Sequence, residues 1–508
     1  MCNLTLGILE NEFWWGGAVN HGYEMPFHRD SCIFLDLRGE REGDQYAPLF
    51  LSSCGRYIWS EKAFTLRMEN GSIRCEGEAA ILPEKGFSSL KGAYLAAMRT
   101  HFPFVKQVPD RRFFDRPQYN TWIELGKEQT TENILRYARD VLENRLQPGI
   151  LMIDEGWAED YGSFTFNTRR IPDPAALISR LHEMGFLVML WVTPVVSCAG
   201  DRFLQLKRSG WLIRDASGVP ACREWWNGFS AVLDLTNPEA AAWYHEQLDG
   251  LMRDYGIDGF KFDAGDCYFY RDDDLTFRRV AAREQTSLYN RIGESYPLNE
   301  FRAAWKYGGR PVVTRLQDKK HSWDTFGINT LIPNTVLQGL LGYAYGCPDM
   351  VGGGEIGSFA GRKELDEELF VRWAQASALM GMMQVSAAPW RVLSPKNAAL
   401  VRKAMRLHTR LGDLIFRLAK HAMETGEPIV RPMAYEFPEE GMEQAAGQFM
   451  LGSGLLAAPV TEKGAVTKTV QLPKGRWIAW NGTAYEGGRT ITVNTTLSDI
   501  PYLIREEA

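Results

Sequence analysis

Lys261 and Asp263, two residues apart, are the pair in this chain whose types and spacing point most directly to chemistry. They lie in the segment Asp258-Gly-Phe-Lys-Phe-Asp-Ala-Gly265. Because side chains alternate along a strand, Lys261 and Asp263 share one face, while Phe260 and Phe262 occupy the other. An apolar outer face with charges inside, ending at glycine, is typical of a barrel strand that brings charged groups to the carboxyl-terminal rim, where such folds do their chemistry.

Cleavage of a glycosidic bond usually requires two carboxyl groups. One stays ionised as nucleophile or base, and the other has a raised pKa and protonates the leaving oxygen. Asp263 is the candidate for the ionised group, since a cation such as Lys261 lowers the pKa of a nearby carboxylate. The alternative is a Lys–Asp pair that only fills the barrel lumen; we favour the catalytic interpretation because charges are seldom buried without a task.

The second carboxyl group is expected in residues 311–324, which combine an apolar strand, an arginine at its end and two aspartates. Asp324 is adjacent to Trp323, whose indole can desolvate an acid, so we predict that Asp324 is the acid/base. Asp318, close to Arg315, is predicted to contact the substrate or to support a group that does. An exchange of roles between Asp318 and Asp324, and a plain surface loop carrying both, remain open at this point.

Polar and aromatic residues also follow other predicted strands. These are Asp154, Trp191 and Asp349. Their repetition at successive strand ends predicts that carboxylates and indoles converge on one rim. The predicted substrate-binding set is therefore Asp154, Trp191, Lys261, Arg315, Asp318, Trp323 and Asp349.

The elements that must position these residues predict a (β/α)8 TIM barrel flanked by two β domains. Short strands and turns fill the first hundred or so residues, at 31–37, 49–52, 56–59 and 64–68, and predict an N-terminal β-sandwich. Apolar runs then alternate with helical periodicity, as in parallel βα units. The candidate barrel strands are 119–124, 149–155, 187–193, 256–263, 311–316, 327–331, 342–347 and 383–387, with helices at 131–144, 174–184, 238–253 and 331–341. The predicted domains are 1–114, 115–420 and a C-terminal β-sandwich at 421–508.

Composition narrows the class of protein. The 508 residues carry a net charge of -6 without a basic stripe, which argues against nucleic acid and anionic membranes as partners. The N-terminus lacks signal-peptide character, so we expect a cytoplasmic protein. Eight cysteines without CxxC spacing favour reduced thiols over a zinc site. We expect no metal or organic cofactor, a small oligosaccharide or glycoside as partner, and leave open whether the chain forms a homo-oligomer.

Several ordered motifs resemble glycoside hydrolase family 31. The resemblance covers residues 115 to 505 and, within the family, points to the branch with the myogenesis-regulating glycosidase and bacterial α-galactosidases. Its motifs include Ile153-Asp-Glu-Gly-Trp157, Phe260-Lys-Phe-Asp-Ala-Gly265, Pro348-Asp-Met-Val-Gly-Gly353, Gly426-Glu-Pro-Ile-Val-Arg-Pro-Met433 and Leu455-Leu-Ala-Ala-Pro-Val460. Three features depart from the family pattern: the loop at Trp323 and Asp324 is shorter, Gly447 stands where the family often has aspartate, and the N-terminal domain is compact.

This resemblance implies a retaining, exo-acting α-glycosidase that works through a covalent glycosyl-enzyme. Asp263 aligns with the family nucleophile and Asp349 with a pocket-lining aspartate. With Asp324 as acid/base, the two carboxyl groups are expected about 5 to 5.5 Å apart. The branch favours α-galactose as glycone, with α-glucose second. A transglycosylase and a non-catalytic carbohydrate-binding relative are the alternative functions.

Overall fold

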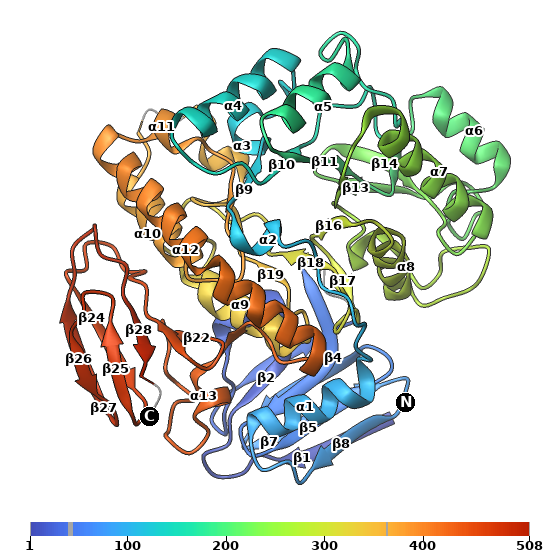
Figure 1. Cartoon of the computed structure of the whole chain (residues 1–508). Coiled ribbons are helices and arrows are strands. Elements are labelled where there is room, and N and C mark those ends of the chain that lie inside the picture. Colours follow the sequence, from blue (N-terminus) through green and yellow to red (C-terminus); the bar gives the residue numbers. More distant parts are fainter. Residues whose placement is uncertain (1, 39–43, 362–363, 507–508) are drawn as a thin grey trace.

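An eight-stranded parallel sheet, curved into a nearly closed barrel, occupies the centre of the computed structural model, which describes residues 2–38, 44–361 and 364–506 (Figure 1). Seven neighbouring pairs are parallel, which confirms the predicted TIM barrel. In spatial order the strands are β19 (Gly346–Cys347), β18 (Val313–Arg315), β16 (Leu298–Phe301), β15 (Gly259–Phe262), β11 (Leu187–Val192), β10 (Ile150–Ile153), β9 (Gln118–Asn120) and β20 (Gln384–Val385).

One predicted barrel strand is wrong. Residues 327–331 form the 3-10 helix η3 (Ile328–Thr330) and the start of helix α9 (Leu331–Leu340). The strand missing from the prediction is β16, where Asn299 and Glu300 interrupt the apolar run. Glu300 accepts a hydrogen bond from Gln384 Nε2 at 2.8 Å across the barrel lumen, so the polar residue belongs to a charged interior.

Helices surround the barrel (Figure 1). The predicted helices at 131–144, 174–184 and 238–253 are confirmed as α4 (Thr131–Glu143), α5 (Pro174–Glu183) and α7 (Pro238–Tyr255). Each begins at a side-chain cap, in which Thr130, Asp173 and Asn237 accept a hydrogen bond from a backbone N–H of the first turn. The other long helices around the barrel are α8 (Ala282–Glu294), α10 (Glu367–Ser377) and α12 (Pro395–Thr425).

The N-terminal part contains an antiparallel sheet and a mixed sheet, in which β17 pairs with β4 in parallel, packed around a shared apolar core. One has the order β1-β7-β6-β3, and the other combines β4, β5 and β8 with β2 and with β17 (Ala304–Trp305) from the barrel region. Helix α1 (Leu90–His101) follows them and departs from the strand-and-turn pattern expected there. The strand bounds are β1 (Cys2–Gly7), β2 (Trp14–Ala18), β3 (Ile33–Asp36), β4 (Gln45–Ser52), β5 (Arg56–Ser60), β6 (Phe64–Glu69), β7 (Ser72–Gly77) and β8 (Ile81–Lys85).

The C-terminal part is again made of strands, in a six-stranded sheet and a two-stranded one. The six-stranded sheet contains β21 (Val430–Arg431), β22 (Phe449–Leu451), β23 (Leu455–Ala457), β28 (Tyr502–Arg505), β25 (Arg476–Ala479) and β26 (Ala484–Glu486); β24 (Thr467–Leu472) pairs with β27 (Arg489–Asn494). Within the described residues, no helix combines the length and apolar character needed to cross a membrane.

A small sheet of three strands projects from the barrel between β11 and α7, and it lies beside the rim (Figure 1). It consists of β12 (Val195–Ser197), β14 (Gly228–Val232) and β13 (Cys222–Trp225). Trp225 packs edge-to-face on Tyr161, at a centroid distance of 4.8 Å. The insertion therefore adds aromatic side chains next to the ends of β10 and β11.

Helix α8 approaches the two strands that precede the candidate active-site residues very closely. A Cβ added at Gly293 would lie 2.3 Å from Phe301 and 2.6 Å from Phe262, the two rings that stack at 4.8 Å on the outer faces of β16 and β15. Glycine is therefore required at this helix position by space, even though it is a poor helix former.

We expect Gly293→Ala to destabilise the protein by about 1–2 kcal/mol, because overpacking outweighs the gain in helix propensity. Chemical denaturation would measure the change. Gly250→Ala in α7 is the matched control, since its added Cβ meets nothing nearer than 3.6 Å. Equal effects of the two substitutions would show that the contact with Phe262 and Phe301 does not constrain α8.

Candidate active site

Asp263 lies directly after β15, where the backbone turns sharply. Ala264 and Gly265 both have positive φ, at 54° and 71°. This turn lets the Ala264 N–H donate to Asp263 Oδ1 at 2.9 Å, while Trp191 Nε1 donates to Oδ2 at 2.8 Å. A non-glycine residue in the left-handed region is uncommon and marks a backbone held by its surroundings. The side chain of Asp263 is therefore fixed from two directions.

Two cations flank the Asp263 carboxylate. Arg302 Nε lies 3.4 Å from Oδ1, and Lys261 Nζ lies 3.8 Å from Oδ2. Burial alone would raise the pKa of Asp263, but Lys261, Arg302, the more distant Arg315 and the Trp191 N–H together outweigh it and lower the pKa to about 2. Asp263 is thus an ionised carboxylate of 8% exposure, the state expected of a nucleophile.

Lys261 also binds Asp154, as expected from their positions at strand ends. Its ammonium donates to Asp154 Oδ2 at 2.7 Å, and both residues are buried. Burial disfavours the charged amine, yet the adjacent Asp154 and Asp263 carboxylates prevail and raise the pKa of Lys261. The parallel register places Lys261 between Trp191 on β11 and Glu300 on β16. Neighbouring strands thus bring three of the predicted site residues, Asp154, Trp191 and Lys261, to Asp263.

Arg302 and Asp266 are central to the site and were not among the predicted site residues. Arg302 hydrogen-bonds the Asp266 carboxylate, which is fully buried, and stands 4.6 Å from the centroid of the Trp226 ring. Burial raises the pKa of Asp266, against the effect of Arg302. Arg302 comes directly after β16, and this position could have marked it as a rim residue. The strand itself was not predicted from the apolar pattern.

Arg315 lies on β18, two strands from β15 in the barrel, and joins three carboxylates. Its Nη1 donates to Asp318 Oδ1 at 2.9 Å and to Asp349 Oδ1 at 2.8 Å, and its Nε lies 3.4 Å from Glu300. Asp349 also accepts hydrogen bonds from the backbone N–H groups of residues 319, 350 and 354. Burial raises the pKa of Asp349, while Arg315 opposes that rise. Asp349 is fully buried, whereas Asp318 keeps 37% of its side chain exposed, so of the two only Asp318 is open to solvent.

The surroundings of Asp324 differ from those predicted. Asp324 is exposed and accepts hydrogen bonds from Ser322 Oγ at 2.7 Å and from the Phe326 N–H at 2.9 Å. These bonds, the Ser322 hydroxyl first, lower the pKa of Asp324. The indole of Trp323 donates to Asp366 Oδ2 at 2.9 Å instead of shielding its neighbour. The predicted desolvation of Asp324 by Trp323 is therefore wrong, because Ser322 and Phe326 of the same short loop donate hydrogen bonds to this aspartate.

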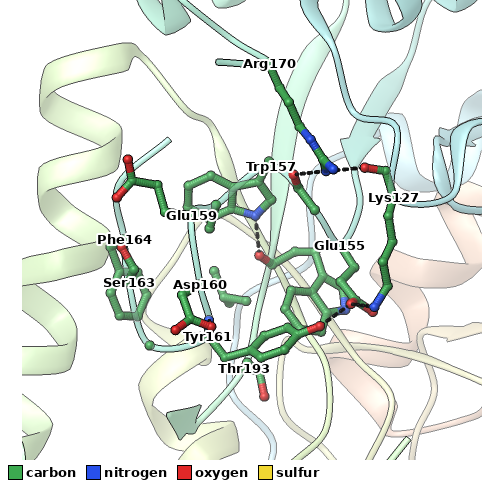
Figure 2. A pocket seen from close by; sticks show the side chains of 15 residues that line it. Lys127, Glu155, Trp157, Glu159, Asp160, Tyr161, Ser163, Phe164, Arg170 and Thr193 are labelled. Carbon is green, nitrogen blue, oxygen red and sulfur yellow. Dashed lines mark hydrogen bonds and ion pairs between the residues drawn. The ribbon is translucent and has the colours of Figure 1, made fainter. Parts of the chain in front are cut away.

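A cavity of about 180 Å³ lies at the ends of β10 and β11 (Figure 2). Trp191 lines it and also binds Asp263, but Asp263 itself does not line it. Figure 2 shows Lys127, Glu155 and Tyr161 grouped at one side; Lys127 Nζ is 3.1 Å from Glu155, and the Tyr161 hydroxyl hydrogen-bonds the same carboxylate. Glu155 was missed as a member of this group, although it follows Asp154 directly.

The described ranges contain no group of three or more histidine, cysteine, aspartate or glutamate side chains placed to bind a metal ion. The buried acids of the rim are instead matched with Lys261, Arg302 and Arg315. This arrangement compensates buried charge by ion pairs and hydrogen bonds within the protein.

The structure combines a (β/α)8 barrel, an ionised carboxylate at the end of one strand and further acids at the same rim. These features are typical of glycosidases with a TIM-barrel fold. The chain belongs to glycoside hydrolase family 31. The family's TIM-barrel domain matches residues 118–418, and its C-terminal domain matches residues 426–508.

Curated relatives share moderate identity. The chain is 32% identical to the mouse (Mus musculus) myogenesis-regulating glycosidase over 399 residues, which cover 77% of this chain and 56% of the relative. It is 28% identical to an alpha-xylosidase of Emericella nidulans over 420 residues, which cover 76% and 52%. The chain thus spans about half the length of the curated relatives that it matches.

Solved structures share the fold. A cycloalternan-degrading enzyme from Trueperella pyogenes, in complex with a covalent intermediate, superposes with a TM-score of 0.86 at 21% identity and covers all of this chain and 78% of the other. A dextranase from Flavobacterium johnsoniae gives a TM-score of 0.85 at 21% identity, with 99% and 66% covered. These likenesses support the barrel and its two flanking parts.

Removing the cation at position 261 tests how Asp263 stays ionised. In Lys261→Met, we expect the pKa of Asp263 to rise by about 1–3 units. Asp263 then takes up its proton at higher pH, so the acidic limb of a kcat/KM profile moves upward. Asp154 also loses its partner, at a cost of about 3–5 kcal/mol in stability.

The double variant Lys261→Met with Asp154→Asn separates these two effects. It is expected to regain much of the stability and to keep the displaced acidic limb. An acidic limb that stays at the wild-type position in both variants would show that Lys261 does not hold Asp263 in its charged state.

Proposed function

We propose that the protein is a retaining, exo-acting α-glycosidase with Asp263 as its nucleophile. The observation that supports this most directly is a buried carboxylate with a pKa near 2, held at the rim of a family 31 barrel by Trp191 and two cations. The name of the Trueperella pyogenes structure, which includes a covalent intermediate, agrees with this mode of action in a relative.

In the proposed mechanism, an oxygen of Asp263 attacks the anomeric carbon and the glycosidic bond breaks, giving a covalent glycosyl-enzyme. The leaving oxygen takes a proton from the acid/base residue, which then removes a proton from the incoming water. Trp191 and Arg302 orient the attacking carboxylate, so little reorganisation is needed before attack. The protein carboxylates supply both chemical roles.

Asp324 remains our proposed acid/base, with Asp318 as the alternative. Hydrogen bonds from Ser322 and Phe326 stabilise the ionised form of Asp324, whereas Asp318 accepts a hydrogen bond from Arg315 Nη1 at 2.9 Å. Catalytic hydrogen bonds in a free enzyme often differ from those in the substrate complex. We therefore infer that substrate binding displaces water around Asp324 and raises its pKa.

The glycone is proposed as α-galactose, by resemblance to the branch with bacterial α-galactosidases, and α-glucose is second. Relatives named as an alpha-xylosidase, an Alpha-glucosidase 2 and a 1,3-alpha-isomaltosidase keep xylose and glucosides in the set to be tested. A relative named as an isomaltosyltransferase is a reason to test transfer to sugars as well as hydrolysis. The cytoplasmic location and the absence of nucleic-acid and membrane partners remain predictions from the sequence.

Hydrolysis of nitrophenyl α- and β-glycosides of galactose, glucose, xylose and N-acetylgalactosamine tests the nucleophile and the glycone together. We expect one α-glycoside to be hydrolysed with an α-configured first product, seen by NMR, and Asp263→Ala to lose at least about 10³-fold in kcat. Azide added to Asp263→Ala should restore turnover and give the β-glycosyl azide.

Asp273→Ala, at an exposed aspartate of the loop after η2 (Cys267–Phe269), is the matched control and should keep wild-type activity. A β-configured first product from wild-type enzyme would establish inversion instead. Sugar binding by calorimetry without turnover of any substrate would support the carbohydrate-binding alternative.

Leaving groups of different basicity identify the acid. A nitrophenolate departs without help, whereas an alkoxide or sugar needs a proton. Loss of the acid should therefore spare kcat/KM for aryl glycosides, which reports the first step, and lower kcat/KM for disaccharides by about 10²–10⁴-fold. We expect this pattern in Asp324→Asn and a uniform loss in Asp318→Asn. The reverse pattern would assign the acid to Asp318.

A further inference from the structure

A second cavity, of about 560 Å³, lies next to the loop that follows Asp263. Four arginines line it: Arg38 after β3, Arg223 on β13, Arg271 beyond η2 and Arg283 in the first turn of α8. Residues Cys267 and Tyr268 of η2 form part of its wall. A polar cavity with this many guanidinium groups has a composition suited to an anion.

Two of these arginines already have carboxylate partners. Arg223 is ion-paired with Asp274 and donates to the Phe269 carbonyl at 2.9 Å. Arg38 pairs with Asp36 at 3.0 Å. Their geometry is therefore set within the protein, and their charges are largely balanced by these carboxylates without a ligand.

Arg283 differs from them. Only 9% of the residue is exposed, yet among the residues that the structure describes its guanidinium has no ion pair and no hydrogen bond. Its guanidinium carbon lies 5.9 Å from the centroid of the Trp305 ring, and the carboxylates of Asp272 and Asp36 act on it electrostatically without a direct contact. Burial lowers the pKa of Arg283, and the nearby Asp272 and Asp36 carboxylates only partly oppose this. A buried cation without a directly bound counter-ion is costly, and proteins normally supply one.

We propose that the cavity binds a small oxyanion of the phosphate or sulfate class, with Arg283 as its principal ligand. A guanidinium presents a planar fork of N–H donors that matches two oxygens of such an anion. The cavity is also lined by Glu224 and Asp272, and Asp272 is held by the Ala282 N–H at 3.0 Å. These two carboxylates repel a large polyanion, so we expect the site to prefer a compact one that binds Arg283 and avoids Asp272.

The position of the cavity links it to the proposed function. Asp266 is bound by Arg302, which contacts Asp263, while Cys267 and Tyr268, the next two residues, line the cavity. The oxyanion has two sources that fit this place: an anionic group on the substrate's aglycone, or a free anion that orders η2. This link rests on the proposed glycosidase function, whereas binding of the anion does not.

Binding of inorganic phosphate and of sulfate tests the site without any need for catalysis. Calorimetric titration and thermal unfolding are compared with potassium chloride at equal ionic strength, because a ligand of the native state raises the melting temperature. We expect saturable binding in wild type and at least tenfold weaker binding in Arg283→Gln. Arg283→Lys, which keeps the charge and loses the fork, should fall between them.

Arg279→Gln is the matched control, since Arg279 is exposed, lies four residues before Arg283 and does not line the cavity. It should bind phosphate as the wild type does. A melting temperature that responds to phosphate no more than to chloride, or equally in Arg283→Gln and wild type, overturns the proposal. Circular dichroism and the melting temperature without anion confirm that each variant is folded.

The two sources are separated by kinetics on an accepted nitrophenyl α-glycoside and on the same glycoside with a sulfate on the aryl ring. A KM that the sulfate lowers in wild type and not in Arg283→Gln assigns the site to the substrate. An unchanged KM, with phosphate still bound in the calorimeter, assigns it to a free anion. If no glycoside is hydrolysed, the binding measurements still decide the proposal about the cavity.

Discussion

The rest of the site depends on keeping one buried carboxylate ionised. Burial by itself would favour the protonated, non-nucleophilic form of Asp263, and the structure reverses this with Lys261 on the same strand and Arg302 from the next one. Lys261 is buried and Arg302 is mostly shielded from solvent, so each requires its own counter-charge, which Asp154 and Asp266 supply. The charges of the rim therefore form one connected system in which a change at one member alters the pKa of the others.

The barrel can accommodate these buried charges because its inner face carries the charged residues while its outer face provides apolar packing. Inward-facing Lys261 and Glu300 sit side by side in register, while the outward-facing rings of Phe262 and Phe301 stack under α8. The close contact at Gly293 fixes that helix against both strands, and the same strands end in Asp263 and Arg302. Apolar packing on the outside thus determines the distance between charged groups at the rim.

Much of this was predictable from the sequence, for identifiable reasons. Alternation in β15 placed Lys261 and Asp263 on one face, and polar residues after β10, β11 and β18 marked the rim. Strand β16 was not predicted because Asn299 and Glu300 interrupt the apolar pattern, and the Glu300 side chain belongs to the charged barrel interior. Arg302, which follows this strand, was therefore not predicted as a site residue either. The desolvation of Asp324 by Trp323 was mispredicted because adjacency in sequence does not determine where the indole points, and the Trp323 indole donates to Asp366.

The two halves of the proposed reaction are prepared to different degrees. On the nucleophile side, Trp191, Ala264, Lys261 and Arg302 already hold Asp263 in its reactive state. On the acid side, Asp324 is exposed and stabilised as a carboxylate, so in the free protein it is not ready to give a proton. A substrate that covers this loop would remove water from Asp324 and raise its pKa by desolvation. Proton donation would then depend on occupancy of the aglycone position, which makes the nature of the leaving group a determinant of the rate.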